Sequence, residues 1–109
     1  MIELKNFLEL AGAVTEVYHN TKLSSINDHA LRLSVMTKPY PWHYHPNTDE
    51  TFIGVEGVVI IETRNAVFEL GPGMMVTIPA NMEHCTRPKG ERSVNLTVER
   101  EDIKTVYVE

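Results

Sequence analysis

Four residues of the sequence carry side chains that bind metal ions, and their spacing allows them to meet. His43 and His45 are two positions apart, so on a β-strand their rings project from the same face. Glu50 follows a short loop, after which the returning chain can bring its carboxylate to the two imidazoles. His84 comes much later, directly after the turn-like segment 79–83. We therefore expect His43, His45, Glu50 and His84 to form one metal site.

The donor set decides which ions such a site would prefer. Three neutral imidazoles and a carboxylate suit one divalent transition metal per chain, namely zinc, iron, manganese, nickel, cobalt or copper. Calcium prefers oxygen ligands alone. Four protein ligands leave about two positions open on an octahedral ion, where water, substrate or dioxygen could bind. The alternative is a chance His-x-His pair on a surface strand, and the added Glu50 and His84 argue against it.

Short strands must position these residues. Runs of β-prone residues separated by turn residues occupy 14–18, 31–36, 51–55, 58–62, 66–70, 74–78, 93–98 and 103–108. Many short strands at this spacing indicate an all-β sandwich or barrel rather than alternating strands and helices. Before them, Leu4, Phe7, Leu8 and Ala11 recur at helical spacing, and Gly12 follows as a stop signal. This pattern predicts a short N-terminal helix packed on the outside of the β-structure.

The segment around the two closely spaced histidines resembles the first signature motif of the cupin family. That motif has a leading glycine, a His-x-His pair, a glutamate and a closing glycine at fixed spacing. His43, His45, Glu50 and Gly57 fit this spacing throughout, whereas Thr37 occupies the position of the leading glycine.

The segment around the third histidine resembles the second cupin motif. Gly73, Pro79 and His84 stand at the motif positions. Asn81 replaces the middle glycine, and Pro88 replaces the final asparagine. Asparagine tolerates a left-handed backbone better than most residues, so the first of these replacements is mild. The two motifs together cover residues 37–88, about half of the chain.

The resemblance implies a fold and a range of activities. The fold is all-β, an antiparallel double-stranded β-helix (a cupin or jelly-roll barrel) with a short N-terminal helix, in a single domain spanning residues 1–109. The family includes dioxygenases, isomerases, epimerases, decarboxylases, storage proteins and sugar-sensing domains. This chain is similar to the small cupins described as mannose-6-phosphate-isomerase-like. That similarity concerns the barrel, and a substrate does not follow from a fold.

Two hypotheses about function remain open at this point. The first is a metal-dependent enzyme, a dioxygenase or an isomerase, that acts on a small organic molecule. The alternative is a non-catalytic module that binds or senses a small molecule and uses the metal as an anchor or structural clip. An ion with a closed coordination shell and a purely structural role is a third possibility. Beyond the metal ligands, the sequence identifies no catalytic residue.

Several other residues are candidates for the pocket. Phe52 shares the strand parity of Glu50 and is expected beside the metal, although an ordinary core aromatic explains it equally well. Met36 and Asn95 belong to strand faces that could contact a substrate or could equally be solvated. Three methionines near the second motif are expected to fill the barrel interior or its rim: Met74, Met75 and Met82.

Composition and charge narrow the partners. The 109 residues carry a net charge of −5 with acidic and basic residues interspersed, which argues against a nucleic-acid partner. No apolar run approaches the ~20 residues that cross a bilayer, and the N-terminus has no signal-peptide pattern. The single cysteine, Cys85, excludes an intrachain disulfide, so we expect a cytoplasmic protein. Outward-facing Trp42 and Tyr44, together with the resemblance, favour a homodimer.

Overall fold

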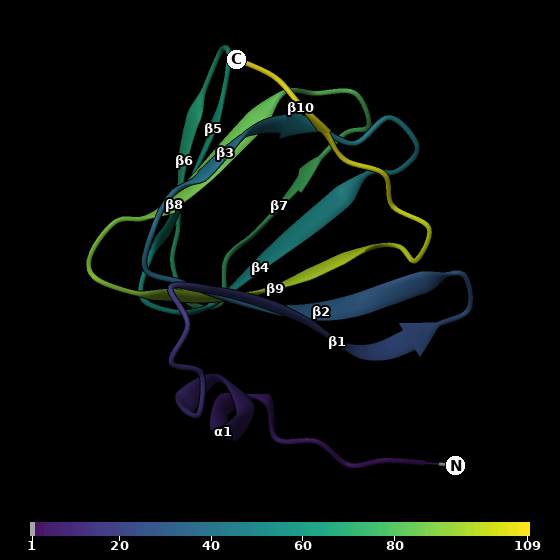
Figure 1. Ribbon diagram of the computed structural model, residues 1–109, viewed down its shortest axis with the longest axis vertical. Helices are drawn as coiled ribbons and strands as arrows, with labels where there is room; N and C mark the ends of the chain where they lie inside the picture. The colour runs from purple at the N-terminus through teal and green to yellow at the C-terminus, as the bar shows by residue number, and fades with distance from the viewer. Residues whose placement is uncertain (1) are drawn as a thin grey trace.

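Two five-stranded antiparallel sheets face each other in the computed structural model, which describes residues 2–109 (Figure 1). The first sheet has the strand order β1-β2-β9-β4-β7, and the second has the order β10-β3-β8-β5-β6. The elements are α1 (Phe7–Gly12), β1 (Tyr18–Ile26), β2 (His29–Met36), β3 (Tyr40–Tyr44), β4 (Glu50–Glu56), β5 (Val59–Thr63), β6 (Val67–Leu70), β7 (Met75–Ile78), β8 (His84–Pro88), β9 (Ser93–Arg100) and β10 (Val106–Tyr107). The predicted all-β fold with a short N-terminal helix is confirmed.

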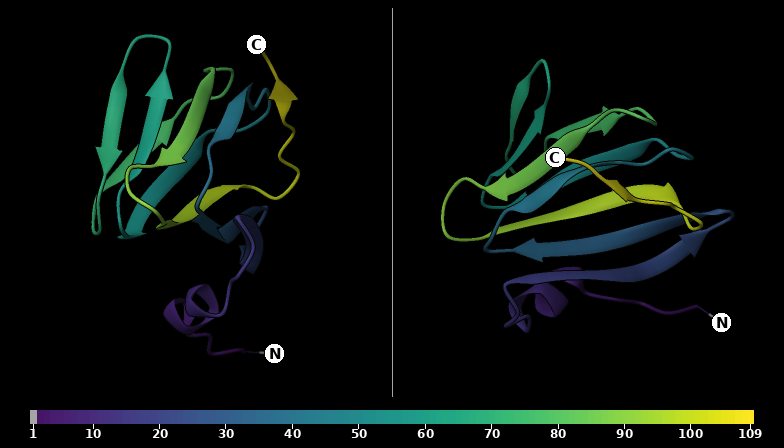
Figure 2. Two further views of the ribbon diagram at one scale, coloured as in Figure 1. Left: turned by 60° about the vertical axis from the view of Figure 1, so that its left-hand side comes forward. Right: turned by 45° about the horizontal axis from the view of Figure 1, so that its top comes forward.

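The first sheet is covered on both faces. On β2, Leu33 and Val35 belong to an apolar cluster on the outer face, whereas Ser34 and Met36 point to the space between the sheets. Figure 2 shows α1 beneath β1 and β2, on the side away from the second sheet. Because side chains alternate along a strand, a strand covered on both faces is buried at successive positions, as Leu33 to Met36 are.

Helix α1 packs on this outer face. The Asn6 side chain caps the helix by accepting hydrogen bonds from the amides of Leu8 and Glu9, both at 3.1 Å. Ala11 is buried against the outer cluster. Leu4, which the helical pattern included, instead precedes the helix and is fully exposed. Within residues 2–109, no helix has the length and apolar character needed to span a membrane.

A second apolar cluster joins the two sheets. Its buried members come from both layers: Met36, Phe52, Val59, Ile61, Leu70 and Ile78. These side chains hold the sheets together over part of their facing surfaces. The remaining space between the sheets is lined by polar side chains and forms a cavity.

One sequence prediction about the strands is wrong, and of the two places expected for three methionines, the interior and the rim, the interior is excluded. The segment 14–18 is not a strand, because β1 begins only at Tyr18 and continues through polar residues to Ile26. An edge strand pairs with one neighbour and faces water, so β1 lacks the apolar alternation of an inner strand. Met74, Met75 and Met82 do not fill the interior and are instead 52%, 65% and 41% exposed. Met75 is the first residue of β7, which is also an edge strand, and Met74 directly precedes it.

Candidate metal centre

The fold brings the four predicted metal ligands together. One donor atom from each of His43, His45, Glu50 and His84 lies within 4.8 Å of the others. His43 on β3 is directly opposite His84 on β8 in the second sheet. Glu50 is the first residue of β4 in the first sheet, and His45 directly follows β3. An ion at this point would therefore connect the two sheets.

A bulge in β3 sets the orientation of the first histidine. The β3–β8 pairing shifts register between Tyr40 and His43, around Pro41, which has no amide hydrogen to donate to the ladder. The Pro41 carbonyl accepts a hydrogen bond from His43 Nδ1 at 2.6 Å. The proline thus interrupts regular pairing and also holds the first imidazole.

The other two imidazoles are held in the same way. His45 Nδ1 donates to the Lys104 carbonyl, and His84 Nδ1 donates to the Met82 carbonyl, both at 2.9 Å. A carbonyl oxygen only accepts, so in each neutral ring Nδ1 carries the proton and Nε2 keeps its lone pair. This arrangement is typical of histidines that bind a metal through Nε2. Lys104 was missed by the sequence analysis, because its contribution is a backbone oxygen.

The inward-facing donor atoms lack partners of their own. Glu50 Oε1 lies 3.2 Å from His45 Nε2 and 3.4 Å from His84 Nε2. All three atoms are buried, and none has a hydrogen-bond partner among the described residues. Lone pairs that face one another without a hydrogen between them repel, and buried polar atoms without partners are costly. A divalent cation with nitrogen and oxygen ligands would satisfy all of them.

Electrostatics leave these groups in the states that bind metals. Burial lowers the pKa of His43 to about 4, so this imidazole is neutral at pH 7. Burial acts to raise the pKa of Glu50, but a proton on Nε2 of His45 or His84 would hydrogen-bond to this carboxylate, and that interaction outweighs burial and holds the pKa at about 2. The pKa of His45 is raised, because Glu50 outweighs the lowering effect of burial. A metal would therefore compete with a proton more strongly at His45 than at His43.

Hydrogen bonds next to the ligands join the loop of the first motif, around residues 45–49, to the loop of the second motif, around residues 79–83. Asn81 has a φ of +70°, so it adopts the left-handed backbone of the motif glycine that it replaces. Its amide donates to the His45 carbonyl at 2.9 Å. The Ala80 amide donates to Asp49 Oδ1 at the same distance. The second loop therefore supports both His45 and His84.

A cavity of about 330 Å³ opens beside the four ligands, between the two sheets. Phe52, Met36 and Asn95, the pocket residues suggested by the sequence, all lie in its wall. Trp42 faces the opposite way, and the guanidinium of Arg64 lies 3.8 Å from the centre of its ring. The volume is at the small end of the range for small-molecule sites.

The cavity also contains a carboxylate that the sequence analysis did not single out. Glu99 is 2% exposed, and its Oε1 accepts a hydrogen bond from Thr97 Oγ1 at 3.0 Å. Its Oε2 has no hydrogen-bond partner within residues 2–109, and Arg32 Nε lies 3.9 Å away. Burial and the charge of Glu50 raise the pKa of Glu99 to about 7. Strand parity was the available signal, because Glu99 continues the inward-facing series of Asn95 and Thr97.

Comparison with known proteins agrees with this geometry. Residues 34–98, more than half of the chain, match the family model Cupin_2, a cupin domain. The chain belongs to the cupin family. A protein of Bacillus subtilis (strain 168) named "Uncharacterized protein YdbB" is 38% identical over 112 residues, which cover 100% of this cupin and 96% of that protein.

Solved structures show the same architecture. A cupin-2 domain protein from Shewanella frigidimarina NCIMB 400 superposes with a TM-score of 0.83 at 26% identity, covering 90% of this cupin and 95% of that chain. A double-stranded β-helix protein from Klebsiella pneumoniae superposes with a TM-score of 0.82 at 14% identity, covering 100% and 99%. The two sheets of this cupin therefore form the double-stranded β-helix. Cupins often bind small-molecule ligands, and the four-residue cluster could bind a metal.

Proposed function

We propose that this cupin is a metal-dependent enzyme that acts on a small organic molecule, with His43, His45, Glu50 and His84 as ligands of one divalent transition metal. The observation that carries the proposal is the set of three buried donor atoms without partners, on Glu50, His45 and His84, beside a cavity. A divalent ion held there supplies Lewis-acid or oxygen-binding chemistry to an adjacent substrate.

The residues of the chain prepare the site for this role. The carbonyls that hold the three Nδ1 atoms prevent the rings from turning, so each Nε2 stays directed at the same point. Phe52 and Met36 provide an apolar part of the cavity wall, and Asn95 provides an amide for hydrogen bonding. We assign these three residues to substrate contact.

Metal content is the direct test. Elemental analysis of purified protein should find about one zinc, iron, manganese, nickel, cobalt or copper ion per chain. His84→Ala should lose most of the bound metal, because it removes one of the four ligands. The His84 ring is 1% exposed, so water can take its place on the ion only at a cost in free energy. His19→Ala is the matched control, since His19 lies on β1 and belongs neither to the four-residue cluster nor to the cavity lining. A wild-type protein that holds no stoichiometric metal after loading with each ion would contradict the proposal.

Catalysis requires a second measurement. The metal-loaded protein should turn over a member of a broad metabolite panel, followed by mass spectrometry and by oxygen consumption. His84→Ala should be inactive, and His19→Ala should match the wild type. Tight ligand binding without turnover would instead favour the alternative, a binding or sensing module in which the metal anchors the ligand.

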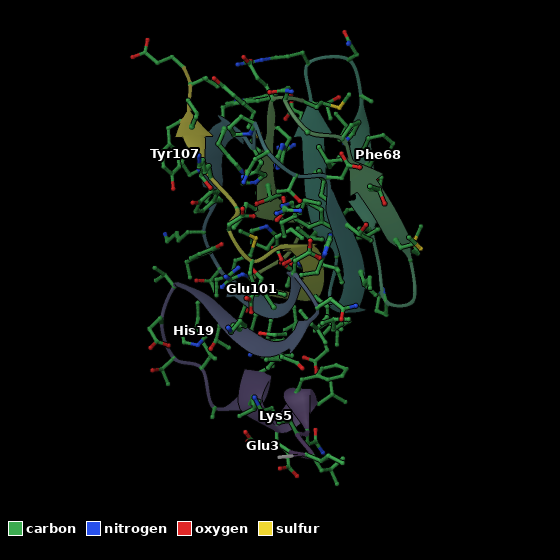
Figure 3. All side chains as sticks on the ribbon, turned by 90° about the vertical axis from the view of Figure 1, so that its right-hand side faces the viewer. Glu3, Lys5, His19, Phe68, Glu101 and Tyr107 are labelled. Carbon is green, nitrogen blue, oxygen red and sulfur yellow. The ribbon has the colours of Figure 1, made fainter. Side chains whose placement is uncertain are left out.

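We further propose a cytoplasmic homodimer. Exposed apolar side chains at the sheet edges, Val67 and Phe68 on β6 and Met75 on β7, offer surface for association. Figure 3 shows Phe68 at the edge of the molecule that lies away from Tyr107. Light scattering at micromolar concentration should report twice the chain mass, and a monomeric mass would contradict the dimer.

A further inference from the structure

Glu99 and Arg32 form a polar group in the cavity that the metal site does not use. They lie on the neighbouring strands β9 and β2, where Arg32 pairs with Thr97, two residues from Glu99. On the other side of β9, the register pairs Phe52 of β4 with Thr97. Because alternate residues share a face, Glu99 lies on the cavity face next to the strand that carries Glu50. Both Glu99 and Arg32 line the cavity.

The hydrogen bonding of Glu99 is incomplete in a way that a purely structural role does not explain. Thr97 Oγ1 satisfies Oε1, whereas Oε2 is buried and none of the residues that the structure describes hydrogen-bonds to it. The Arg32 Nε atom is 3.9 Å from Oε2, which is beyond hydrogen-bond distance. A buried carboxylate oxygen without a partner destabilises a fold unless something else supplies the hydrogen. The free oxygen therefore indicates a place for a hydrogen-bond donor of a ligand.

Arg32 supplies the complementary charge. It is the only lysine or arginine among the described residues that line the cavity, and its side chain is 25% exposed. A guanidinium in this position can reach a ligand from the cavity wall and form two parallel hydrogen bonds with a carboxylate. Amide and hydroxyl groups of Asn20 and Ser34 lie in the same part of the lining.

We propose that Glu99 and Arg32 are a recognition site for a small hydroxylated carboxylic acid. Arg32 binds the carboxylate, and Glu99 Oε2 accepts a hydrogen bond from a hydroxyl group of the same molecule. The inference rests on the proposed function only in taking this cavity as the ligand site. A site built to pair with a hydroxyl discriminates strongly against an analogue that lacks it, because the buried oxygen is then left unpaired.

Two matched pairs of acids test this assignment. Calorimetry compares malate with succinate and lactate with propionate, on zinc-loaded and on metal-stripped protein. The wild type should bind the hydroxylated member about tenfold more tightly in at least one pair. Glu99→Met, which has similar length and no charge, should remove this preference. Glu99→Gln should reduce it at least threefold, and this variant keeps an oxygen for the Thr97 hydroxyl.

Substitution of Arg32 should change the acid affinities in a different way from substitution of Glu99. Arg32→Met should weaken both members of a pair by about tenfold and leave their ratio unchanged, because both carry the carboxylate. Glu62→Gln is the control, since Glu62 pairs with Arg87 and does not line the cavity. It should bind all four acids as the wild type does.

The outcomes separate this inference from the proposed function. A wild-type protein that binds none of the four acids, or binds them without a hydroxyl preference, overturns the inference. A preference that survives in Glu99→Met and Glu99→Gln overturns it as well. A hydroxyl preference that depends on Glu99, in a protein that takes up no stoichiometric metal when loaded with each ion, supports the inference and contradicts the metal-dependent function. A protein that holds stoichiometric metal but shows no preference for the hydroxylated acids supports the metal site and overturns the inference.

Discussion

At the scale of single residues, two carboxylates in the same cavity ionise very differently. Glu50 is stabilised as an anion by two imidazoles, and its pKa is about 2. Glu99 has one hydroxyl donor and a distant guanidinium, and burial beside the charge of Glu50 raises its pKa to about 7. Like charges in a confined space cannot both ionise without cost, so the proton goes to the carboxyl with fewer donors. This cavity therefore combines an anionic metal ligand with a weaker acid.

The raised pKa of Glu99 predicts a loss of stability at alkaline pH. Its pKa rises from an ordinary value of 4.5 to about 7 on folding, so its favourable contribution is present below pH 4.5 and is lost as pH rises through about 7. The loss amounts to about 3 kcal/mol in the free energy of unfolding. Urea unfolding across this range should show the free energy of unfolding of Glu99→Gln increasing relative to that of the wild type as pH rises. The difference between Glu62→Gln and the wild type should not change with pH. Parallel curves for Glu99→Gln and the wild type would contradict the assignment.

Metal affinity should fall with acidification, beginning near neutral pH. The pKa of His45 is raised, so a proton already occupies this ligand at mildly acidic pH and must leave when the metal binds. His43 stays neutral until about pH 4 and does not contribute to this first decrease. Zinc affinity from competition with a chelator should drop about tenfold per pH unit below the pKa of His45. A flat profile down to pH 5 would show that His45 is not a ligand.

At the scale of elements, a motif glycine has a purely steric role. Gly57 has a φ of +65°, and an added Cβ would lie 2.4 Å from the Arg92 carbonyl oxygen. Gly57→Ala should lower the free energy of unfolding by at least about 2 kcal/mol, from backbone strain and from the clash. Gly12→Ala is the control, because nothing lies within 4 Å of its Cβ position and alanine favours the helix. Equal stability of the two variants in urea would contradict this explanation.

The left-handed turn at Asn81 should control the metal site indirectly. Asn81→Gly should leave stability within about 0.5 kcal/mol of the wild type, whereas Asn81→Val should cost about 1–2 kcal/mol. The valine variant should also bind zinc more weakly, because this turn holds His45 and precedes the Met82 carbonyl that orients His84. Calorimetric zinc titration beside thermal melts separates the two effects. Unchanged zinc affinity in a destabilised Asn81→Val would show that the turn does not position the ligands.

The sequence predicted most elements because strand parity and turn residues are local signals. The positions of Glu50 and His84 could be anticipated from motif spacing, and the turn at Asn81 from its tolerance of left-handed backbone. Strand β1 could not be predicted, because at a sheet edge its residues need not be apolar. The Lys104 carbonyl was also unpredictable, since any residue has one and only the tertiary fold brings it to His45.

At the scale of the whole molecule, the candidate site connects the two sheets. His43 and His84 belong to the second sheet and Glu50 to the first, so a bound ion would hold the layers together. An ion at one hundred times its dissociation constant should add about 2.7 kcal/mol to the stability of the folded state. For a chain of this size, chelator treatment should then lower the melting temperature by roughly 10 °C. His84→Ala should show no such shift, and an equal shift in that variant would indicate binding elsewhere.

The distribution of the ligands along the chain also affects how the protein folds. His43, His45 and Glu50 lie within eight consecutive residues, whereas His84 and the Lys104 carbonyl arrive from segments far along the sequence. The unfolded chain can therefore hold an ion with its local three ligands before either sheet has formed. Pairings between distant segments form slowly, so the complete coordination must come late in folding. Excess zinc during refolding should populate chains in which only the three local ligands bind the ion, and should slow the final folding step. During synthesis, the same three residues would be available to an ion before the cavity has formed.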